Sequence, residues 1–127
     1  MKNLKLFFKT GFYFANIVLI IFYLYPGSII GWFLYNDFSI QPQITRDFMI
    51  SSNHFYAFIV LTSLGVFSYY NTKKINLLSV YLFLLSVILE LFHFFIPNRG
   101  FEFSDLFGNL AGVLFTIIIY KIRKKYV

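Results

Sequence analysis

A long stretch without charge constrains this chain more than any other feature of its sequence. No residue between Lys9 and Asp37 is charged, and the run is longer than the ~20 apolar residues that one membrane-spanning helix requires. Pro26-Gly27 interrupts the run, because proline cannot continue a helix. We therefore predict a first spanning helix over about 6–25, closed by Pro26, and an aromatic interfacial anchor or half-helix over 28–38.

The composition is typical of an integral membrane protein. Hydrophobic residues make up 59% of the 127 residues and charged residues 13%, and the mean hydropathy of +0.73 lies far outside the soluble range. The absence of cysteine excludes disulfides, thiolate nucleophiles and thiolate metal sites. The net charge of +6 does not indicate nucleic acid, because the basic residues flank apolar runs as topology signals do. The 19 phenylalanines and 10 tyrosines indicate membrane-facing bulk and interface belts rather than a stacking platform for bases.

The N-terminal segment resembles a secretory signal peptide, because Lys2, Lys5 and Lys9 lie beside its apolar run. No small-x-small cleavage site follows the run, only Tyr25-Pro26-Gly27-Ser28. We therefore expect the segment to be retained as the first membrane helix.

Three further apolar segments are predicted to be helices. A polar loop over 37–52, a basic turn over 71–74 and a turn around Pro97 and Arg99 separate them. Ser104 is the predicted N-cap of the last helix, and Asp105 is well placed against that helix dipole. The sequence therefore predicts an all-α polytopic membrane protein, one domain over 1–127, with transmembrane helices at about 6–25, 53–70, 75–96 and 104–120.

The distribution of charge predicts how these four helices are oriented. Nine basic residues fall on one side of the membrane, and only Arg46 and Arg99 fall on the other. The nine are Lys2, Lys5, Lys9, Lys73, Lys74, Lys121, Arg123, Lys124 and Lys125. The positive-inside rule places their side, and with it both termini, in the cytoplasm. The acidic residues then all fall on the outer side or near it, since Glu90 lies near the outer end of its helix.

Polar side chains gather at the outer ends of the last three helices. His54 opens the second helix, Glu90 and His93 lie near the end of the third, and Asp105 and Asn109 open the fourth. The pairs are spaced i, i+3 and i, i+4, so each pair shares one helical face. Because the last two helices are consecutive and antiparallel, we expect their polar stripes to face each other.

Burial cost favours one shared pocket. An ionised carboxylate facing lipid costs on the order of 3 kcal/mol or more, so we expect Glu90 to face the bundle interior. Its available partners are His54, His93, Arg99 and Asn109. Two alternatives stay open: Glu90 carries a proton, or it reaches the headgroups as a snorkelling side chain.

Simpler roles also fit several of these residues. His54 could serve only as a hydrogen-bonding residue at the membrane interface. Asp105 could serve only as a favourable charge at the start of a helix. The pair Glu90-x-x-His93 can ligate metals in bundles, but a single copy does not make a site, so no metal and no cofactor is predicted. The GxxxG formed by Gly108 and Gly112 predicts close helix packing.

The order and spacing of the polar residues resemble the VanZ-like family of small membrane proteins. The shared pattern is a His opening one helix, Glu-x-x-polar, an outer-loop Arg, and Asp-x-x-x-Asn-x-x-Gly. It covers roughly residues 54–120, and the Tyr-Leu-Tyr-Pro ending of the first helix is compatible by position. The matching positions are His54 (followed by Phe55), Glu90, Arg99, Asp105, Asn109 and Gly112.

The chain departs from the family pattern at three places. His93 stands where the family usually has Gln, Phe58 where it has Tyr, and Ile50-Ser51 where it has Asp-Lys. The missing Lys removes one charge from the outer site, which bears on ligand preference. The resemblance implies a multi-pass protein of the bacterial cytoplasmic (inner) membrane with a cell-envelope role. The founding member is associated with resistance to the glycopeptide teicoplanin, and the family has no established biochemical activity.

Two functions of different classes follow. In the first, which we favour, a non-enzymatic factor in the lipid bilayer binds an outer-face ligand: a lipid-linked phosphate, a glycopeptide headgroup or a partner protein. Arg99 would anchor the anion, His54 and Asn109 would add hydrogen bonds, and Asp105 and Glu90 would orient Arg99.

In the second, a small membrane enzyme acts on a lipid-linked envelope intermediate. His54 or Glu90 would serve as general base, and Arg99 would stabilise phosphate charge. The sequence lacks a paired phosphatase-like motif, a nucleophile in a strained turn and a metal-ligand set, which disfavours this reading. A transport pathway would need several copies of so small a bundle.

Overall fold

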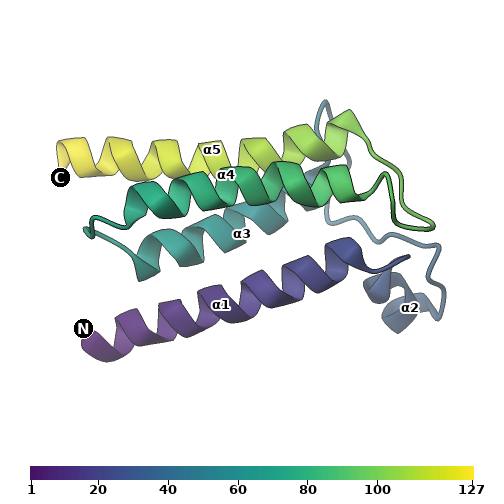
Figure 1. The fold of residues 1–127 in the computed structure, drawn as a ribbon, viewed down its shortest axis with the longest axis horizontal. Helices are drawn as coiled ribbons and strands as arrows, with labels where there is room; N and C mark the ends of the chain where they lie inside the picture. Colours follow the sequence, from purple (N-terminus) through teal and green to yellow (C-terminus); the bar gives the residue numbers. More distant parts are fainter.

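The computed structural model describes all 127 residues and is entirely helical. Its five helices are α1 (Lys2–Leu24), α2 (Ile29–Tyr35), α3 (Ser52–Ser68), α4 (Ile75–Phe92) and α5 (Phe103–Tyr126). The four long helices α1, α3, α4 and α5 pack into a bundle (Figure 1). Both termini lie at one end of this bundle, and α2 and the two long connecting loops lie at the other end (Figure 1).

Three helices, α1, α4 and α5, are long and apolar enough to cross a membrane. The outer surface of the bundle is correspondingly apolar: Phe7 is 68% exposed and Leu77 is 70% exposed. The remaining long helix, α3, has 17 residues and contains no charged side chain. It contacts each of the other three long helices, most extensively α5.

The short helix α2 occupies the segment predicted as an anchor or half-helix. The side chain of its N-cap, Ser28, accepts a hydrogen bond from the Gly31 backbone N–H at 2.9 Å. Asn36 ends the helix in the left-handed conformation with φ 54°, which asparagine tolerates better than most residues. Trp32 stacks on Phe38 with ring centroids 5.7 Å apart, so this segment folds back on itself.

Several predicted helix ends are wrong. The first helix begins at Lys2 rather than near residue 6, and the last helix ends at Tyr126 rather than near residue 120. The helix predicted to reach residue 96 ends at Phe92 with His93 as its C-cap. The amides of Phe94 and Phe95 bond three residues back, and the proline that follows residue 96 disfavours a helical conformation there. The last helix begins after Glu102 rather than after Ser104, because the Leu106 N–H donates to the Glu102 carbonyl at 3.1 Å.

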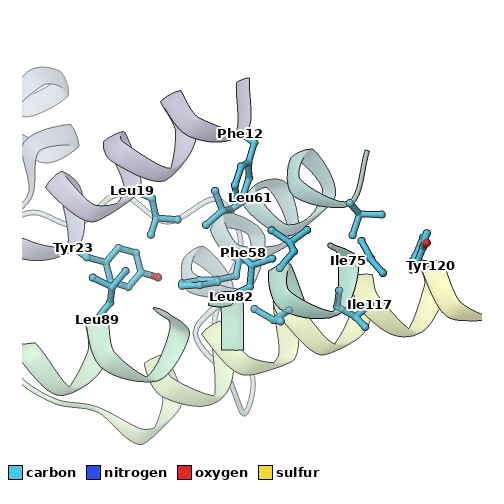
Figure 2. Close-up of a cluster of buried hydrophobic side chains, with 13 residues drawn as sticks. Phe12, Leu19, Tyr23, Phe58, Leu61, Ile75, Leu82, Leu89, Ile117 and Tyr120 are labelled. Carbon is cyan, nitrogen blue, oxygen red and sulfur yellow. The ribbon is translucent and has the colours of Figure 1, made fainter. Parts of the chain in front are cut away.

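A single hydrophobic cluster fills the space between the long helices (Figure 2). Phe58 and Leu82 are fully buried at its middle. Tyr23 and Leu89 lie at one end of the cluster and Tyr120 at the other (Figure 2). Tyr23 belongs to the last turn of α1, so its polar hydroxyl stands where the apolar core meets the loop end of the bundle.

Two glycines allow α5 to approach α3 closely. A Cβ added to Gly108 would lie 2.7 Å from the Ser51 carbonyl oxygen, and one added to Gly112 would lie 2.6 Å from the Phe55 carbonyl oxygen. Real Cβ atoms do not come this near to backbone, so only glycine fits at both positions. The GxxxG spacing therefore lies on the face of α5 that contacts the α3 backbone.

Candidate functional site

Three helix ends are tied together at the loop end of the bundle. The Ser51 backbone N–H donates to the Ser104 carbonyl at 3.0 Å and joins the starts of α3 and α5. The Glu102 N–H donates to Glu90 Oε1 and joins the start of α5 to the end of α4. The predicted site residues come from three separate segments of the sequence, and these bonds hold the segments in one place.

Glu90 is the most deeply buried charged residue of this place, with a side chain that is 0% exposed. Its Oε1 accepts from the Glu102 N–H and lies 3.2 Å from His93 Nδ1. Its Oε2 has no hydrogen-bond partner and lies 3.9 Å from His54 Nε2. The side chain therefore faces the bundle interior, with one oxygen satisfied and the other aimed at His54.

His93 fixes the position of Glu90. Its Nε2 lies 2.9 Å from the Tyr23 carbonyl oxygen, and because a carbonyl only accepts, Nε2 must carry the hydrogen. The 3.2 Å contact between Nδ1 and Glu90 Oε1 then holds one proton, on either the imidazole or the carboxyl group. The His93 ring also stacks on Tyr23 with centroids 5.8 Å apart, so both ring nitrogens and one ring face are occupied.

His54 lies between two carboxylates. Its Nε2 faces Glu90 Oε2 at 3.9 Å, and its Nδ1 lies 3.5 Å from Asp105 Oδ1. The same Nδ1 is 2.8 Å from the Ser51 hydroxyl, and Tyr23 meets the ring edge to face at 5.0 Å. His54 and Asp105 are 15% and 19% exposed, so they remain accessible where Glu90 is not.

Asn109 is not available to a ligand, contrary to the role expected for it. It is fully buried, its Oδ1 accepts from the Tyr23 hydroxyl at 2.6 Å, and its Nδ2 donates to the Ser86 carbonyl at 3.0 Å. These two bonds connect α5 to α1 and to α4. Asn109 therefore fixes three helices together behind the site.

Arg99 is held by backbone carbonyls rather than by carboxylates. Its Nη2 donates to the carbonyl oxygens of Phe22 and Gly27, both at 2.8 Å, and its Nε donates to that of Tyr25 at 3.1 Å. The expected orientation of Arg99 by acidic side chains is wrong, since no carboxylate lies within ion-pair distance of it. The cause is the end of α1, where carbonyls without helical partners attract a cation.

The guanidinium nevertheless keeps capacity for a ligand. Nη1 makes no hydrogen bond within the protein, so its two N–H groups remain free. Partial burial lowers the pKa of Arg99 from its ordinary value, but a guanidinium stays charged at neutral pH all the same. Arg99 is thus a fixed cation with spare donors.

A polar cavity of about 840 Å³ opens over these residues. Nineteen residues line it and only one of them is hydrophobic. Four of the predicted site residues take part, namely His54, His93, Arg99 and Asp105. Glu90 and Asn109 lie beneath the surface of the cavity and do not line it.

The polar loop over 37–52 forms one wall of the cavity and is fixed to the start of α3. Asp47 Oδ1 accepts from the Ser52 backbone N–H at 2.8 Å, and the Ser52 hydroxyl donates to the Thr45 carbonyl at 2.6 Å. Asn53 Nδ2 donates to the Pro42 carbonyl at 2.6 Å. Asp47 thus satisfies a free amide at a helix N-terminus, which orders the loop.

An apolar groove of about 680 Å³ adjoins the polar cavity. Residues of α1, α2 and α3 line it together with the segment 41–44, and 13 of its 19 lining residues are hydrophobic. Five residues line both spaces: Gln41, Gln43, Asn53, His54 and Arg99. The two spaces therefore meet at polar side chains.

Tyr23 is the site residue that sequence reasoning missed. Its hydroxyl binds Asn109, its carbonyl binds His93, and its ring contacts both histidines. Asn109 and His93 need partners from the first helix, and this was the signal in the sequence. However, a tyrosine near the end of an apolar run is also typical of an interface belt.

No protein-family model, curated protein or solved structure matches the chain.

Proposed function

We propose that this chain is a VanZ-like integral membrane protein of the bacterial cell envelope that binds an amphiphilic, lipid-linked ligand. One observation carries the proposal: the polar cavity and the apolar groove share Arg99, His54 and three further polar residues. A ligand with an anionic head and a hydrocarbon chain fits this pair of spaces. The family resemblance implies a role in the cell envelope, and the founding member of that family is associated with glycopeptide resistance.

The head group would occupy the polar cavity. A volume of about 840 Å³ is within the usual range of small-molecule sites. The free Nη1 donors of Arg99 suit a phosphate, because hydrogen bonds from a charged donor to an anionic oxygen are strong. The hydrocarbon chain would lie in the groove against α1 and α3, where apolar area leaves water or lipid.

We propose four membrane spans with both termini in the cytoplasm. The fourth span is α3: at 1.5 Å per residue its 17 residues measure roughly 25 Å, close to the ~30 Å hydrocarbon core. Nine basic side chains gather on the end of the bundle that carries the termini and the α3–α4 turn, and the positive-inside rule orients that end inward. The polar cavity then opens to the outer face of the cytoplasmic membrane.

Topology is tested directly, because the chain has no cysteine of its own. Ile44 is 74% exposed on the cavity loop, and Lys124 lies in the last turn of α5. In intact cells a membrane-impermeant maleimide should label Ile44→Cys and leave Lys124→Cys unlabelled. The reverse pattern would place the cavity in the cytoplasm and end the proposal of an outer-face site.

Ligand binding is tested with three probes that separate the head from the chain. A long-chain polyprenyl phosphate should bind the purified protein more tightly than the matching polyprenol, which has no phosphate. It should also bind more tightly than a short-chain prenyl phosphate, which leaves the groove empty. Equal binding of all three probes would contradict the proposal.

The variant Arg99→Gln should abolish the preference for the phosphate. The matched control Arg46→Gln should keep it, because the Arg46 side chain makes no hydrogen bond or ion pair within the protein. If both variants behave alike, Arg99 does not bind the head group.

A second candidate is a small membrane enzyme acting on a lipid-linked intermediate. The observation that favours it is the position of His54 between Glu90 and Asp105, since an imidazole beside carboxylates suits acid–base chemistry. The variant His54→Gln separates the two functions. If it binds the polyprenyl phosphate normally but a lipid-linked precursor is no longer turned over, the enzyme is the correct assignment and the binding factor is not.

A further inference from the structure

We infer that His54, Glu90 and Asp105 form a binding site for one divalent transition-metal ion where α3, α4 and α5 meet. One ligand atom from each residue lies within 4.8 Å of the others. This inference does not rest on the proposed lipid-linked ligand, because the metal site is built only from side chains of the chain itself.

The geometry is close to that of a ligated ion. Bonds of about 2.0–2.2 Å to nitrogen and oxygen place neighbouring ligand atoms roughly 3–3.5 Å apart. His54 lies 3.5 Å from Asp105 Oδ1 and 3.9 Å from Glu90 Oε2, measured from its two ring nitrogens. An ion uses one nitrogen, so small rotations of the carboxylates would complete the set.

The unpartnered oxygen of Glu90 points to a cation. Oε2 is buried and has no hydrogen-bond donor, although Oε1 of the same carboxylate has two neighbours that hold it. Buried polar atoms normally have partners, and ligating carboxylates are typically held through their other oxygen by outer-sphere groups. A metal ion at Oε2 supplies the missing partner.

Charge also favours an ion at this place. Glu90 and Asp105 both approach His54, and no lysine or arginine pairs with either carboxylate. Two carboxylates around one divalent ion form a neutral unit, which suits burial within a helix bundle. Asp105 supplies one negative charge, and Glu90 supplies a second when the proton of its contact with His93 lies on the imidazole.

The Glu90-x-x-His93 pair, the metal motif considered from sequence, is not the ligand set. His93 Nε2 donates to the Tyr23 carbonyl, and His93 Nδ1 faces Glu90 Oε1, so neither nitrogen is free to bind an ion. Its role toward an ion is to hold Glu90 in place. The ligand set of one imidazole and two carboxylates suits Zn²⁺ or Mn²⁺ better than Ca²⁺ or Mg²⁺, which prefer oxygen alone.

The remaining coordination positions would face the polar cavity. His54 and Asp105 line that cavity while Glu90 lies beneath it. Water or an anionic group in the cavity would complete the shell of the ion, as at open metal sites. The ion would therefore be accessible from one side only.

The experiment uses the full chain purified in detergent, stripped with a chelator and titrated with ZnCl₂ by calorimetry. We expect one Zn²⁺ per protein. Glu90→Gln should weaken binding by more than about 100-fold, the upper limit for loss of an outer-sphere partner, and His93→Gln by about 10–100-fold. The matched control Glu102→Gln makes the same chemical change at another cavity carboxylate. It keeps the backbone N–H that holds Glu90 Oε1, so it should bind as the original chain does.

Four results would overturn the inference. They are no Zn²⁺ bound by the original chain, equal binding by Glu90→Gln, an equal loss in Glu102→Gln, and a Co²⁺-loaded protein with the weak absorption of the hydrated ion. The last measurement needs no variant, so it decides the matter even if Glu90→Gln fails to fold. A Co²⁺ spectrum typical of low-symmetry nitrogen and oxygen ligation would support the site. This result does not depend on whether the protein binds a polyprenyl phosphate.

Discussion

Replacing Arg99 by lysine separates the charge of this residue from its geometry. The guanidinium bridges the carbonyls of Phe22, Tyr25 and Gly27 with three hydrogen bonds. Lysine keeps a positive charge near the end of α1, so its interaction with the helix dipole survives. Its single ammonium group cannot reproduce a planar fork that spans three carbonyls.

The size of the effect follows from these bonds. Hydrogen bonds to charged groups contribute ~1.5–3 kcal/mol each when well shielded, and partial exposure reduces this to about 1 kcal/mol here. Lysine retains about one of the three bonds, so Arg99→Lys should lose about 2 kcal/mol of local stability. At 1.4 kcal/mol per factor of ten, the last turn of α1 should open roughly 30-fold more often.

Hydrogen exchange measured by mass spectrometry reports this opening. Peptides covering the last turn of α1 should exchange faster in Arg99→Lys, while peptides of α5 should be unchanged, because the opening is local. Arg46→Lys provides the control, since Arg46 makes no hydrogen bond or ion pair. Unchanged exchange in Arg99→Lys, or the same acceleration in Arg46→Lys, would refute the conclusion that the hydrogen bonds of Arg99 stabilise the end of α1.

Three further predictions concern packing, buried polarity and pH. Gly112→Ala should destabilise the bundle by about 1–3 kcal/mol, because its Cβ would meet the Phe55 carbonyl oxygen at 2.6 Å. The control Gly100→Ala has nothing within 4 Å of the added Cβ, so it should leave the thermal midpoint in detergent unchanged. A double-mutant cycle of Tyr23→Phe and Asn109→Ala should give a coupling energy of roughly 0.5–2 kcal/mol, and a coupling of zero would show that the hydroxyl–amide bond contributes nothing to stability. The hydroxyl and the backbone N–H of Ser39 both donate to Asp37 and lower its pKa; the turn should therefore be fully formed above the ordinary aspartate pKa and lost as pH falls through the lower folded value. An NMR titration of the Ser39 amide checks this, with Asp37→Asn as the variant that should abolish the transition.

The apolar runs of the sequence were sufficient to predict an all-helical chain with membrane-spanning helices. Length and hydropathy are properties of a segment alone, so α1, α4 and α5 could be predicted without any tertiary contact. Helix ends depend on contacts that sequence does not display. The end of α4 at Phe92 is an example, because the His93 side chain binds α1.

Topology predicted which polar residues would meet, but not what each would do. An antiparallel order brings His54, Glu90 and Asp105 to one end of the bundle, and the structure has them there. Helical spacing shows which residues share a face, but it does not reveal which neighbour that face meets. Asn109 was therefore expected to serve a ligand, whereas it bonds to α1 and α4. Arg99 was expected beside carboxylates, whereas it reaches the carbonyls of α1.

The gathering of nine basic side chains at one end of the bundle has an electrical consequence. Moving one elementary charge across 100 mV changes its energy by about 2.3 kcal/mol. In an energised membrane the two orientations of this bundle therefore differ by many times the thermal energy, in favour of the basic end on the negative side. A chain that has inserted with this polarity is held by the membrane voltage as well as by its hydrophobic helices, and inversion after insertion would have to carry nine cations against the field.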